Sequence, residues 1–396
     1  MSSPTGREQL LRHADAVVPE DELDEKLALG RPLRVKLGVD PTAPAVTLGW
    51  AVVLRKLRHF QELGHTAVLI IGDFTAQVGD PSERDSTRRR LSASEVNGYA
   101  ENVLGQFEKI LLPEPLEVRR NSEWLSTMGM PEILELTSAA TVAQMMERAD
   151  FDKRYDEGTP ISVMEFLYPL LQGYDSVAVE ADVELGGGDQ LWNLMMGRSV
   201  QEKYGMEPQV ALTMPILVGL DGVRRMGQSL DNYIGIDDPP EEMFGKTMSI
   251  PDEAMSSWFR LAADLPVDQV EKIETDLETG RLPAVEAKRR LAREIVGLYW
   301  GEDAAQQAEE EFDRVFKRGE EPESMPEHPL GDDDPVHLPS LLREVFSVSG
   351  TEAKRLIDQG AVTLDGDGVQ EQHLPRNKLA GRVLKVGKRR FARLVG

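Results

Sequence analysis

The chain has 396 residues, of which 40% are apolar, so it is long enough for a large core and for two or three domains. It contains no cysteine, no apolar run of about 18 residues and no secretory signal, which excludes disulfides and thiol catalysis and predicts a cytoplasmic protein without a membrane span. Its formal net charge of −24 opposes nucleic-acid binding by the chain as a whole, and its six histidines lack metal-ligand spacing, so we expect no histidine-based metal site.

The first predicted elements form a strand–helix–strand unit. Residues 33–39 alternate in polarity and end before Asp40-Pro41, which is typical of a strand that meets a loop. Residues 49–63 have apolar residues at helical spacing and end at Gly64, and residues 66–71 form a short apolar run before Gly72-Asp73. This order predicts a doubly wound parallel sheet with ligands at the carboxyl ends of its strands.

The remaining elements follow in chain order. We expect helices with short breaks over residues 95–165, a short strand at 182–185 before Gly186-Gly187-Gly188, and an all-helical stretch at 240–318. Residues 319–336 are acidic and proline-rich, which predicts a linker before a small separate domain at 337–396. From His337 onward, eleven basic residues stand against six acidic ones, so this part carries +5 and the rest −29. A general acidic bias that did not extend to residues 337–396 would give the same difference in net charge.

One polar face stands out in the middle of the chain. Tyr168, Gln172 and Asp175 lie at i, i+4 and i+7 of a predicted helix and therefore share one side of it. These side chains can accept hydrogen bonds from a phenol hydroxyl and from an ammonium group. An ordinary helix with one polar stripe would show the same spacing.

Several segments in this order resemble class I aminoacyl-tRNA synthetases of the tyrosyl type. The segments are 36–43, 47–50, 72–75, 79–82, 168–175, 186–190 and 225–229. Residues 349–357 and 360–366 resemble the small RNA-binding domain that ends many bacterial tyrosyl enzymes, so the resemblance covers essentially the whole chain. Lys36-Leu37-Gly38 and Thr159-Pro160-Ile161-Ser162 resemble the second bacterial subtype.

The resemblance implies an architecture and a reaction. It implies a Rossmann-like α/β catalytic domain at 1–238 with a helical dimerisation insertion around residues 120–165. An α-helical anticodon-binding domain at 239–318, the linker at 319–336 and a small α+β RNA-binding domain at 337–396 would follow. The implied activity joins tyrosine to tRNA(Tyr) through tyrosyl-adenylate, in a homodimer. ATP would be a substrate, with Mg²⁺, and no tightly bound cofactor or fixed metal is implied.

The resemblance also implies roles for individual residues. Tyrosine would be bound by Lys36, Thr75, Asp80, Tyr168, Gln172, Asp175 and Gln190. ATP would be bound by Asp40, Thr42, Gly49, Gly187, Asp189, Met226 and Ser229. The catalytic residues would be Thr47, Trp50, Arg84, Arg88, Arg225 and Gln228. The tRNA would be bound by Lys354, Arg355, Lys388, Arg389 and Arg390.

Two of these segments depart from the family pattern. The first usually reads His-x-Gly-His and is here Thr47-Leu48-Gly49-Trp50; the second usually reads Lys-Met-Ser-Lys-Ser and is here Arg225-Met226-Gly227-Gln228-Ser229. These positions stabilise phosphate charge, so their change bears on activation alone. We expect a working tyrosine–tRNA ligase; the alternatives are a paralogue that only binds tyrosine or tRNA, and an enzyme that activates a tyrosine-like acid.

Overall fold

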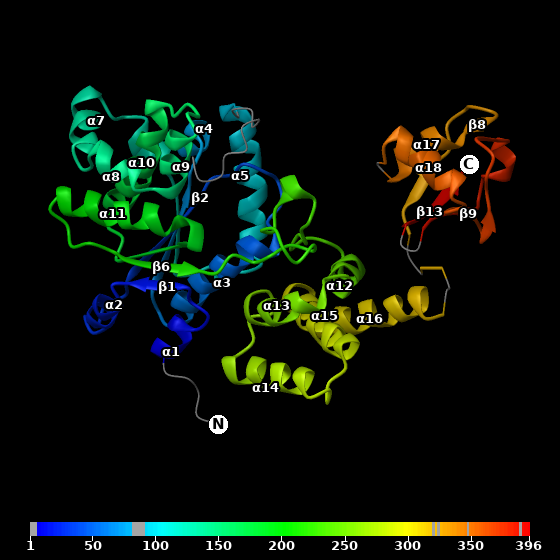
Figure 1. Ribbon diagram of the computed structural model, residues 1–396, viewed down its shortest axis with the longest axis horizontal. Coiled ribbons are helices and arrows are strands. Elements are labelled where there is room, and N and C mark those ends of the chain that lie inside the picture. Colours follow the sequence, from blue (N-terminus) through cyan, green and yellow to red (C-terminus); the bar gives the residue numbers. More distant parts are fainter. Residues whose placement is uncertain (1–5, 81–91, 319–320, 323–324, 347, 388–389) are drawn as a thin grey trace. The chain divides into compact units, whose positions relative to one another are not determined.

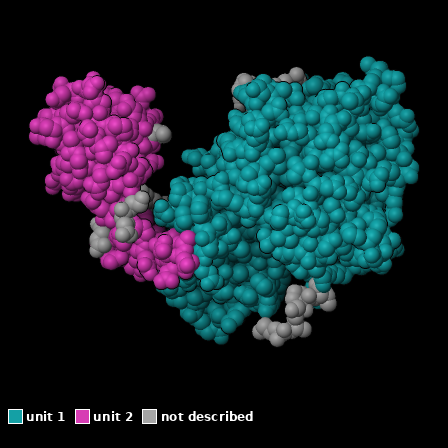
Figure 2. Space-filling view, turned by 180° about the vertical axis from the view of Figure 1, so that it is seen from behind, with its two compact units in different colours: residues 1–302 teal, residues 303–396 magenta. Residues whose placement is uncertain are grey.

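The computed structural model describes residues 6–80, 92–318, 321–322, 325–346, 348–387 and 390–396 (Figure 1). The chain divides into two compact units, residues 1–302 and residues 303–396 (Figure 2). Within the described residues, no helix is both long and apolar enough to cross a membrane.

The first unit is built on a six-stranded sheet of order β1-β6-β5-β2-β3-β4. The strands β2 (Arg34–Val39), β3 (Thr66–Ile71), β4 (Leu116–Arg120), β5 (Val183–Gly187) and β6 (Val210–Met214) run parallel. Only the edge strand β1 (Ala16–Val18) is antiparallel among the strands of this sheet. The chain builds outward from β2 to β4 and then returns to β5, so the strand order reverses between β2 and β5. The predicted doubly wound sheet is confirmed, and this reversal is where such sheets bind ligands.

The prediction of helices throughout residues 95–165 is wrong at one place. Leu116–Arg120 forms β4, which pairs with β3 at the sheet edge. Three of its five residues are charged and only two are apolar, because an edge strand is covered less than a central one. The rest of this stretch is helical: α5 (Ala93–Phe107), α6 (Ser122–Leu125), α7 (Met130–Thr137), α8 (Val142–Met146) and α9 (Ala149–Asp156).

Helices cover both sides of the sheet. The helix α3 (Leu48–Glu62) packs against β2, β3, β5 and β6, and its expected position at residues 49–63 is confirmed. The helix α10 (Val163–Ala178) packs along α11 (Leu191–Lys203), and Figure 1 shows this pair on the side of the sheet away from α3. Thr47 caps α3, because its hydroxyl oxygen accepts the backbone N–H of Trp50 at 3.4 Å.

The expected helical stretch after residue 240 is confirmed. It contains α12 (Pro240–Met248), α13 (Met255–Leu261), α14 (Val267–Glu278), α15 (Ala284–Trp300) and α16 (Glu302–Phe316). The shorter helices α1 (Gly6–Leu11), α2 (Glu20–Leu27) and α4 (Thr75–Val78) complete the first unit. The helices up to α15 fall in the first unit with the sheet.

The second unit contains a small α+β fold. Its helices are α17 (Leu338–Phe346) and α18 (Gly350–Asp358), and its five-stranded sheet has the order β10-β9-β12-β13-β7. The strands are β7 (Glu327–Pro329), β9 (Val362–Leu364), β10 (Asp367–Gly368), β12 (Val383–Val386) and β13 (Arg390–Val395), with β8 (Val336–His337) and β11 (His373–Leu374) forming a separate pair. Since β7 pairs with β13, the small fold begins inside the segment that we expected to be a linker.

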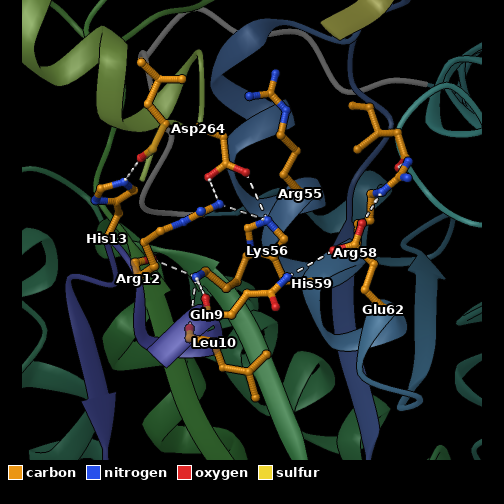
Figure 3. Close-up of polar contacts among 12 residues, drawn as sticks. Gln9, Leu10, Arg12, His13, Arg55, Lys56, Arg58, His59, Glu62 and Asp264 are labelled. Carbon is orange, nitrogen blue, oxygen red and sulfur yellow. Dashed lines mark hydrogen bonds and ion pairs between the residues drawn. The ribbon is translucent and has the colours of Figure 1, made fainter. Parts of the chain in front are cut away.

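A buried charge cluster fixes the second half of α3 to the helices that follow residue 240 (Figure 3). Asp264, after α13, forms an ion pair with Arg12 at 2.8 Å and a hydrogen bond with His59 at 3.0 Å. Burial opposes ionisation of Asp264, but the hydrogen bond from His59 and the nearby positive charges outweigh it and lower the pKa of Asp264 to about 2. Lys56 donates to the carbonyl oxygens of Leu10 at 2.9 Å and Arg12 at 2.7 Å, at the end of α1. The cluster thus connects α1, α3 and the loop after α13.

We expect Asp264→Asn to lower the free energy of unfolding by about 3 kcal/mol at neutral pH, because it leaves buried cations without their partner. Since the folded-state pKa is depressed, the wild type should lose this stabilisation as the pH falls from about 4 towards 2. Urea unfolding at several pH values measures both effects. The exposed Asp268→Asn on α14 is the matched control, and an equal loss in both variants would contradict the role of the cluster.

Candidate functional site

The candidate site lies at the carboxyl ends of β2, β3 and β5, where the strand order reverses. Asp40 follows β2, Thr75 begins α4 after β3, and Asp189 follows β5. The polar face of α10 completes this group, because Tyr168 contacts Asp40 after β2 and Asp175 contacts Asn121 after β4. Residues predicted from four distant segments are therefore brought together.

A continuous chain of hydrogen bonds connects the end of β2 to α10. The Tyr168 hydroxyl donates to Asp40 at 3.0 Å, and the Thr75 hydroxyl donates to the other oxygen of Asp40 at 2.7 Å. The Asn121 amide then donates to Thr75 at 2.9 Å and to Asp175 at 3.2 Å. Gly72 is required beside this chain, since a Cβ there would lie 1.9 Å from the Asp40 carboxylate.

Asp175 is a buried carboxylate with acceptor capacity left over. It accepts from the Trp124 indole at 2.8 Å and from Asn121 at 3.2 Å, which uses two of about four lone-pair positions. Burial raises the pKa of Asp175 to about 6, although the charge of Lys36 and these two hydrogen bonds oppose the rise. The residue can thus receive one more strong donor, such as a hydroxyl group.

A buried ion pair between β2 and β5 supports α10. Lys36 on β2 is fully buried and lies 2.9 Å from Glu184 on β5, which is 1% exposed. The Lys36 ammonium also donates to the Gln172 carbonyl oxygen and to the Ser176 hydroxyl, both at 2.8 Å. These contacts account for all three of its N–H groups. The Gln172 side chain donates to Glu184 at 3.1 Å.

A second polar group lies at the loop after β5. Gln190 donates to Asp80 at 2.9 Å and accepts from Asn193 at 2.9 Å. Asn193 is held in turn by Arg148 at 3.2 Å. Asp80 and Gln190, which the sequence predicted for the same ligand, are therefore in direct contact.

The two altered segments lie side by side although about 180 residues separate them. Leu48 donates its backbone N–H to the Ile234 carbonyl at 2.9 Å, and Ile236 donates to Val46 at 2.9 Å. The Gln228 amide bonds to both backbone groups of Ala45, donating at 2.7 Å and accepting at 3.3 Å. This two-point contact joins the second segment to the loop that leads into the first.

The individual side chains of these segments have different surroundings. A Cβ on Gly49 would lie 3.5 Å from Met226, so the two segments are in close contact at this point. Trp50 is half-buried, with its ring centroid 6.4 Å from that of Phe107. Arg225 is exposed and lies 3.9 Å from Asp189, which brings a guanidinium to the loop after β5.

The other predicted residues are placed as follows. Thr42 and Gly187 are half-buried, and Ser229 is exposed. In the second unit, Lys354, Arg355 and Arg390 are exposed, and Arg355 is paired with Glu352 at 2.6 Å. Arg84, Arg88, Lys388 and Arg389 lie outside the described residues. Among those that are described, no group of three or more histidine or acidic side chains could hold a metal ion.

Sequence reasoning missed four residues of this region: Asn121, Trp124, Glu184 and Gln209. Asn121 and Trp124 follow β4, which was mistaken for helix, so their proximity to Asp175 was hidden. A signal for Glu184 was present, because Glu184 is the one charged residue of β5 and Lys36 is an opposite charge between the apolar residues of β2. Such charges are tolerated in a core only when they are paired.

Comparison with known proteins agrees with this arrangement. A family model described as tRNA synthetases class I (W and Y) matches residues 28–317. The chain is 50% identical over 390 residues to a tyrosine–tRNA ligase of Moorella thermoacetica, covering 97% of this chain and 94% of that protein. It is 47% identical over 388 residues to a tyrosine–tRNA ligase of Thermotoga maritima, covering 98% and 96%.

Solved structures show the same fold. A tyrosyl-tRNA synthetase of Archaeoglobus fulgidus complexed with L-tyrosine has a TM-score of 0.64 at 23% identity, covering 76% of this chain and 98% of that one. A truncated mitochondrial tyrosyl-tRNA synthetase of Aspergillus nidulans has a TM-score of 0.64 at 21% identity, covering 79% and 95%. The resemblance predicted from the sequence is confirmed: the chain belongs to the class I tRNA synthetases of the tryptophan and tyrosine type, among the bacterial tyrosine–tRNA ligases.

Proposed function

We propose that the chain activates tyrosine with ATP and transfers the tyrosyl group to tRNA(Tyr). The observation that carries this proposal is the polar face of α10. Its residues Tyr168, Gln172 and Asp175 all contact residues of the sheet or of the segments that follow its strands. The relatives named tyrosine–tRNA ligase, which match nearly the whole chain, support the same reaction.

Recognition of tyrosine follows from the buried acceptor. Asp175 accepts the phenol hydroxyl, while Trp124 and Asn121 hold its carboxylate in place. Phenylalanine would leave this carboxylate buried without the donor, so the site disfavours it strongly. Gln172 and the Asp80–Gln190 pair bind the ammonium and carboxylate end of the amino acid, on the side of the altered segments 47–50 and 225–229.

Activation requires positive charge and N–H donors at the phosphates. A tyrosine carboxylate oxygen attacks the α-phosphorus of ATP, and the bond to the pyrophosphate oxygen breaks, so charge builds on the leaving group. Arg225 supplies a guanidinium, and the first turn of α3 supplies backbone N–H groups and its helix dipole. Thr47 and Gln228 hold these two segments in place, and Arg84 and Arg88 are further proposed donors. Mg²⁺ would enter with ATP as part of the substrate.

Transfer requires the tRNA to reach the same site. The basic C-terminal part, with a net charge of +5 in a chain of −24, provides the electrostatic contact through Lys354, Arg355, Lys388, Arg389 and Arg390. The helices of residues 239–318 are the proposed anticodon-binding domain. We place this reaction in the cytoplasm, where tRNA is charged.

A second copy of the chain is the proposed partner of the helical insertion. The large apolar residues Met130, Leu134, Val142, Tyr155 and Val163 are 62–78% exposed on α7 to α10. So many exposed apolar side chains on neighbouring helices are typical of an interface. We propose that a homodimer covers them.

We expect the purified protein to exchange pyrophosphate into ATP only when tyrosine is present. Arg225→Ala should lower the exchange rate about a hundred- to a thousandfold, because it removes a donor from the developing phosphate charge. Arg260→Ala on α13 is the matched control, since its side chain is paired with Glu274 at 2.7 Å. Tyrosine binding by a wild type that shows no exchange would favour the binding paralogue and contradict the proposal.

We expect kcat/KM for tyrosine to fall by up to tenfold per pH unit below about pH 6, because protonation of Asp175 there removes the negative charge that strengthens its hydrogen bond from the phenol. Asp175→Asn should remove this dependence and reduce discrimination against phenylalanine by at least about tenfold. Asp156→Asn, exposed at the end of α9, should change neither quantity. Unchanged discrimination in Asp175→Asn would refute the pocket assignment.

We expect Leu134→Asp to shift the protein from dimer to monomer in sedimentation velocity, because it places a charge in the proposed apolar interface. Val223→Asp is the matched control, since Val223 is 81% exposed outside the insertion and should leave the dimer intact. A wild type that is monomeric at micromolar concentration would contradict the proposed interface.

A further inference from the structure

The nitrogen and the oxygen of the Gln172 side-chain amide differ in their hydrogen bonding. Its amide nitrogen donates to Glu184 at 3.1 Å. Its amide oxygen is buried and has no hydrogen-bond partner within the part of the chain that the structure describes. A buried amide oxygen without a donor costs free energy, so this atom is suited to accept a hydrogen from a ligand.

Glu184 determines the orientation of the Gln172 side-chain amide. The two ends of an amide have nearly the same shape, so only their partners distinguish them. An ionised carboxylate accepts hydrogen bonds and cannot donate them, so it can take only the NH₂ end of Gln172. The amide oxygen is therefore directed away from Glu184.

The Glu184 carboxylate is itself fixed from several sides. It accepts from the Ser176 hydroxyl at 3.2 Å and from the Gln209 amide, and it pairs with Lys36 at 2.9 Å. Glycine is needed at position 197 on α11, since a Cβ there would lie 2.6 Å from the Gln209 amide nitrogen and 3.2 Å from the Glu184 carboxylate. The Lys36 ammonium supplies the opposite charge that a carboxylate in the core requires.

We propose that Glu184, neutralised by Lys36, is a positioning residue for the α-ammonium of the substrate. It holds the NH₂ end of Gln172 and leaves the amide oxygen to accept a hydrogen from the ammonium group. The inference rests on the proposed function, because it takes tyrosine as the ligand of the α10 face. Lys36 acts here through Glu184, since its three N–H groups already have acceptors.

This arrangement selects for the amino group of the ligand. A reversed amide would point its NH₂ group at the ammonium and repel it. Desaminotyrosine has the same phenol and carboxylate but lacks the ammonium, so its binding does not depend on the orientation of Gln172. The ratio of the two affinities therefore reports on this one contact.

The test measures binding of tyrosine and of desaminotyrosine by calorimetry. The variant is Lys36→Met combined with Glu184→Met, because removing both charges avoids an unpaired buried ion. We expect tyrosine affinity to fall about tenfold, as for loss of one hydrogen bond to a charged group, and desaminotyrosine affinity to stay within about twofold. Equal weakening of both ligands would overturn the inference, because it would indicate a general loss of pocket structure.

The control is a second, partly buried ion pair that ends on the same helix. Arg154 on α9 lies 2.6 Å from Glu165 on α10, and the two residues are changed together to Met. We expect the ratio of the two affinities to stay at its wild-type value in this control. A fall in the ratio as large as in the first variant would overturn the inference, because support of α10 by any ion pair would then suffice.

Gln172→Leu provides the second measurement. It should weaken tyrosine alone, and adding the Lys36 and Glu184 changes should then have little further effect, because all act on one contact. Additive losses would overturn the inference. A wild type that binds both ligands but exchanges no pyrophosphate would instead contradict the proposed function and leave the positioning role supported by the affinity ratio.

Discussion

The buried ion pair between Lys36 and Glu184 joins the two central strands of the sheet and carries the helix that faces the site. An ion pair in a core is favourable only when its remaining hydrogen-bonding positions are filled. Ser176, Gln172 and Gln209 fill them here, so β2, β5, α10 and the start of β6 are held in one arrangement. The position of Gln172, and with it the polar end of the site, follows from that requirement.

The altered ATP segments affect a different part of the molecule. Val46 and Leu48 pair through their backbones with Ile236 and Ile234, which follow the second segment, and Gln228 is bonded to Ala45 rather than presenting a cation. The loop that leads into the first segment is thus held by the second, and Arg225 is the cation that the second segment keeps. The proposed tyrosine contacts lie on α10 and directly after β4, which these changes do not touch. The changes in these two segments therefore concern the stabilisation of phosphate charge during activation.

Much of the fold could be predicted from the sequence because its signals are local. The apolar run of β3 and the spacing of α3 indicated the strand–helix–strand unit, and the all-helical stretch at 240–318 was equally clear. The edge strand β4 was missed because its charges resemble those of an exposed helix face. Asn121 and Trp124 follow β4, so they were not recognised as site residues either. The partners of Asp175 depend on contacts about 50 residues apart, which no local pattern contains.

Family resemblance supplied the roles of the site residues, and the structure supplied their connections. Asp40 and Thr75 were assigned to different ligands, yet they are hydrogen-bonded at 2.7 Å. Lys36 was assigned to tyrosine, yet its donors are all used within the core. These differences arise because a sequence motif shows which residues belong to a site and does not show which of them face the ligand.

The most direct measurement of this account is a crystal structure of the chain with a non-hydrolysable analogue of tyrosyl-adenylate. The account predicts that the phenol oxygen lies within hydrogen-bond distance of Asp175 and that the ammonium lies on the amide oxygen of Gln172. The phosphate should face Arg225 and the first turn of α3. A phenol ring directed away from Asp175, or an ammonium held only by other groups, would contradict it.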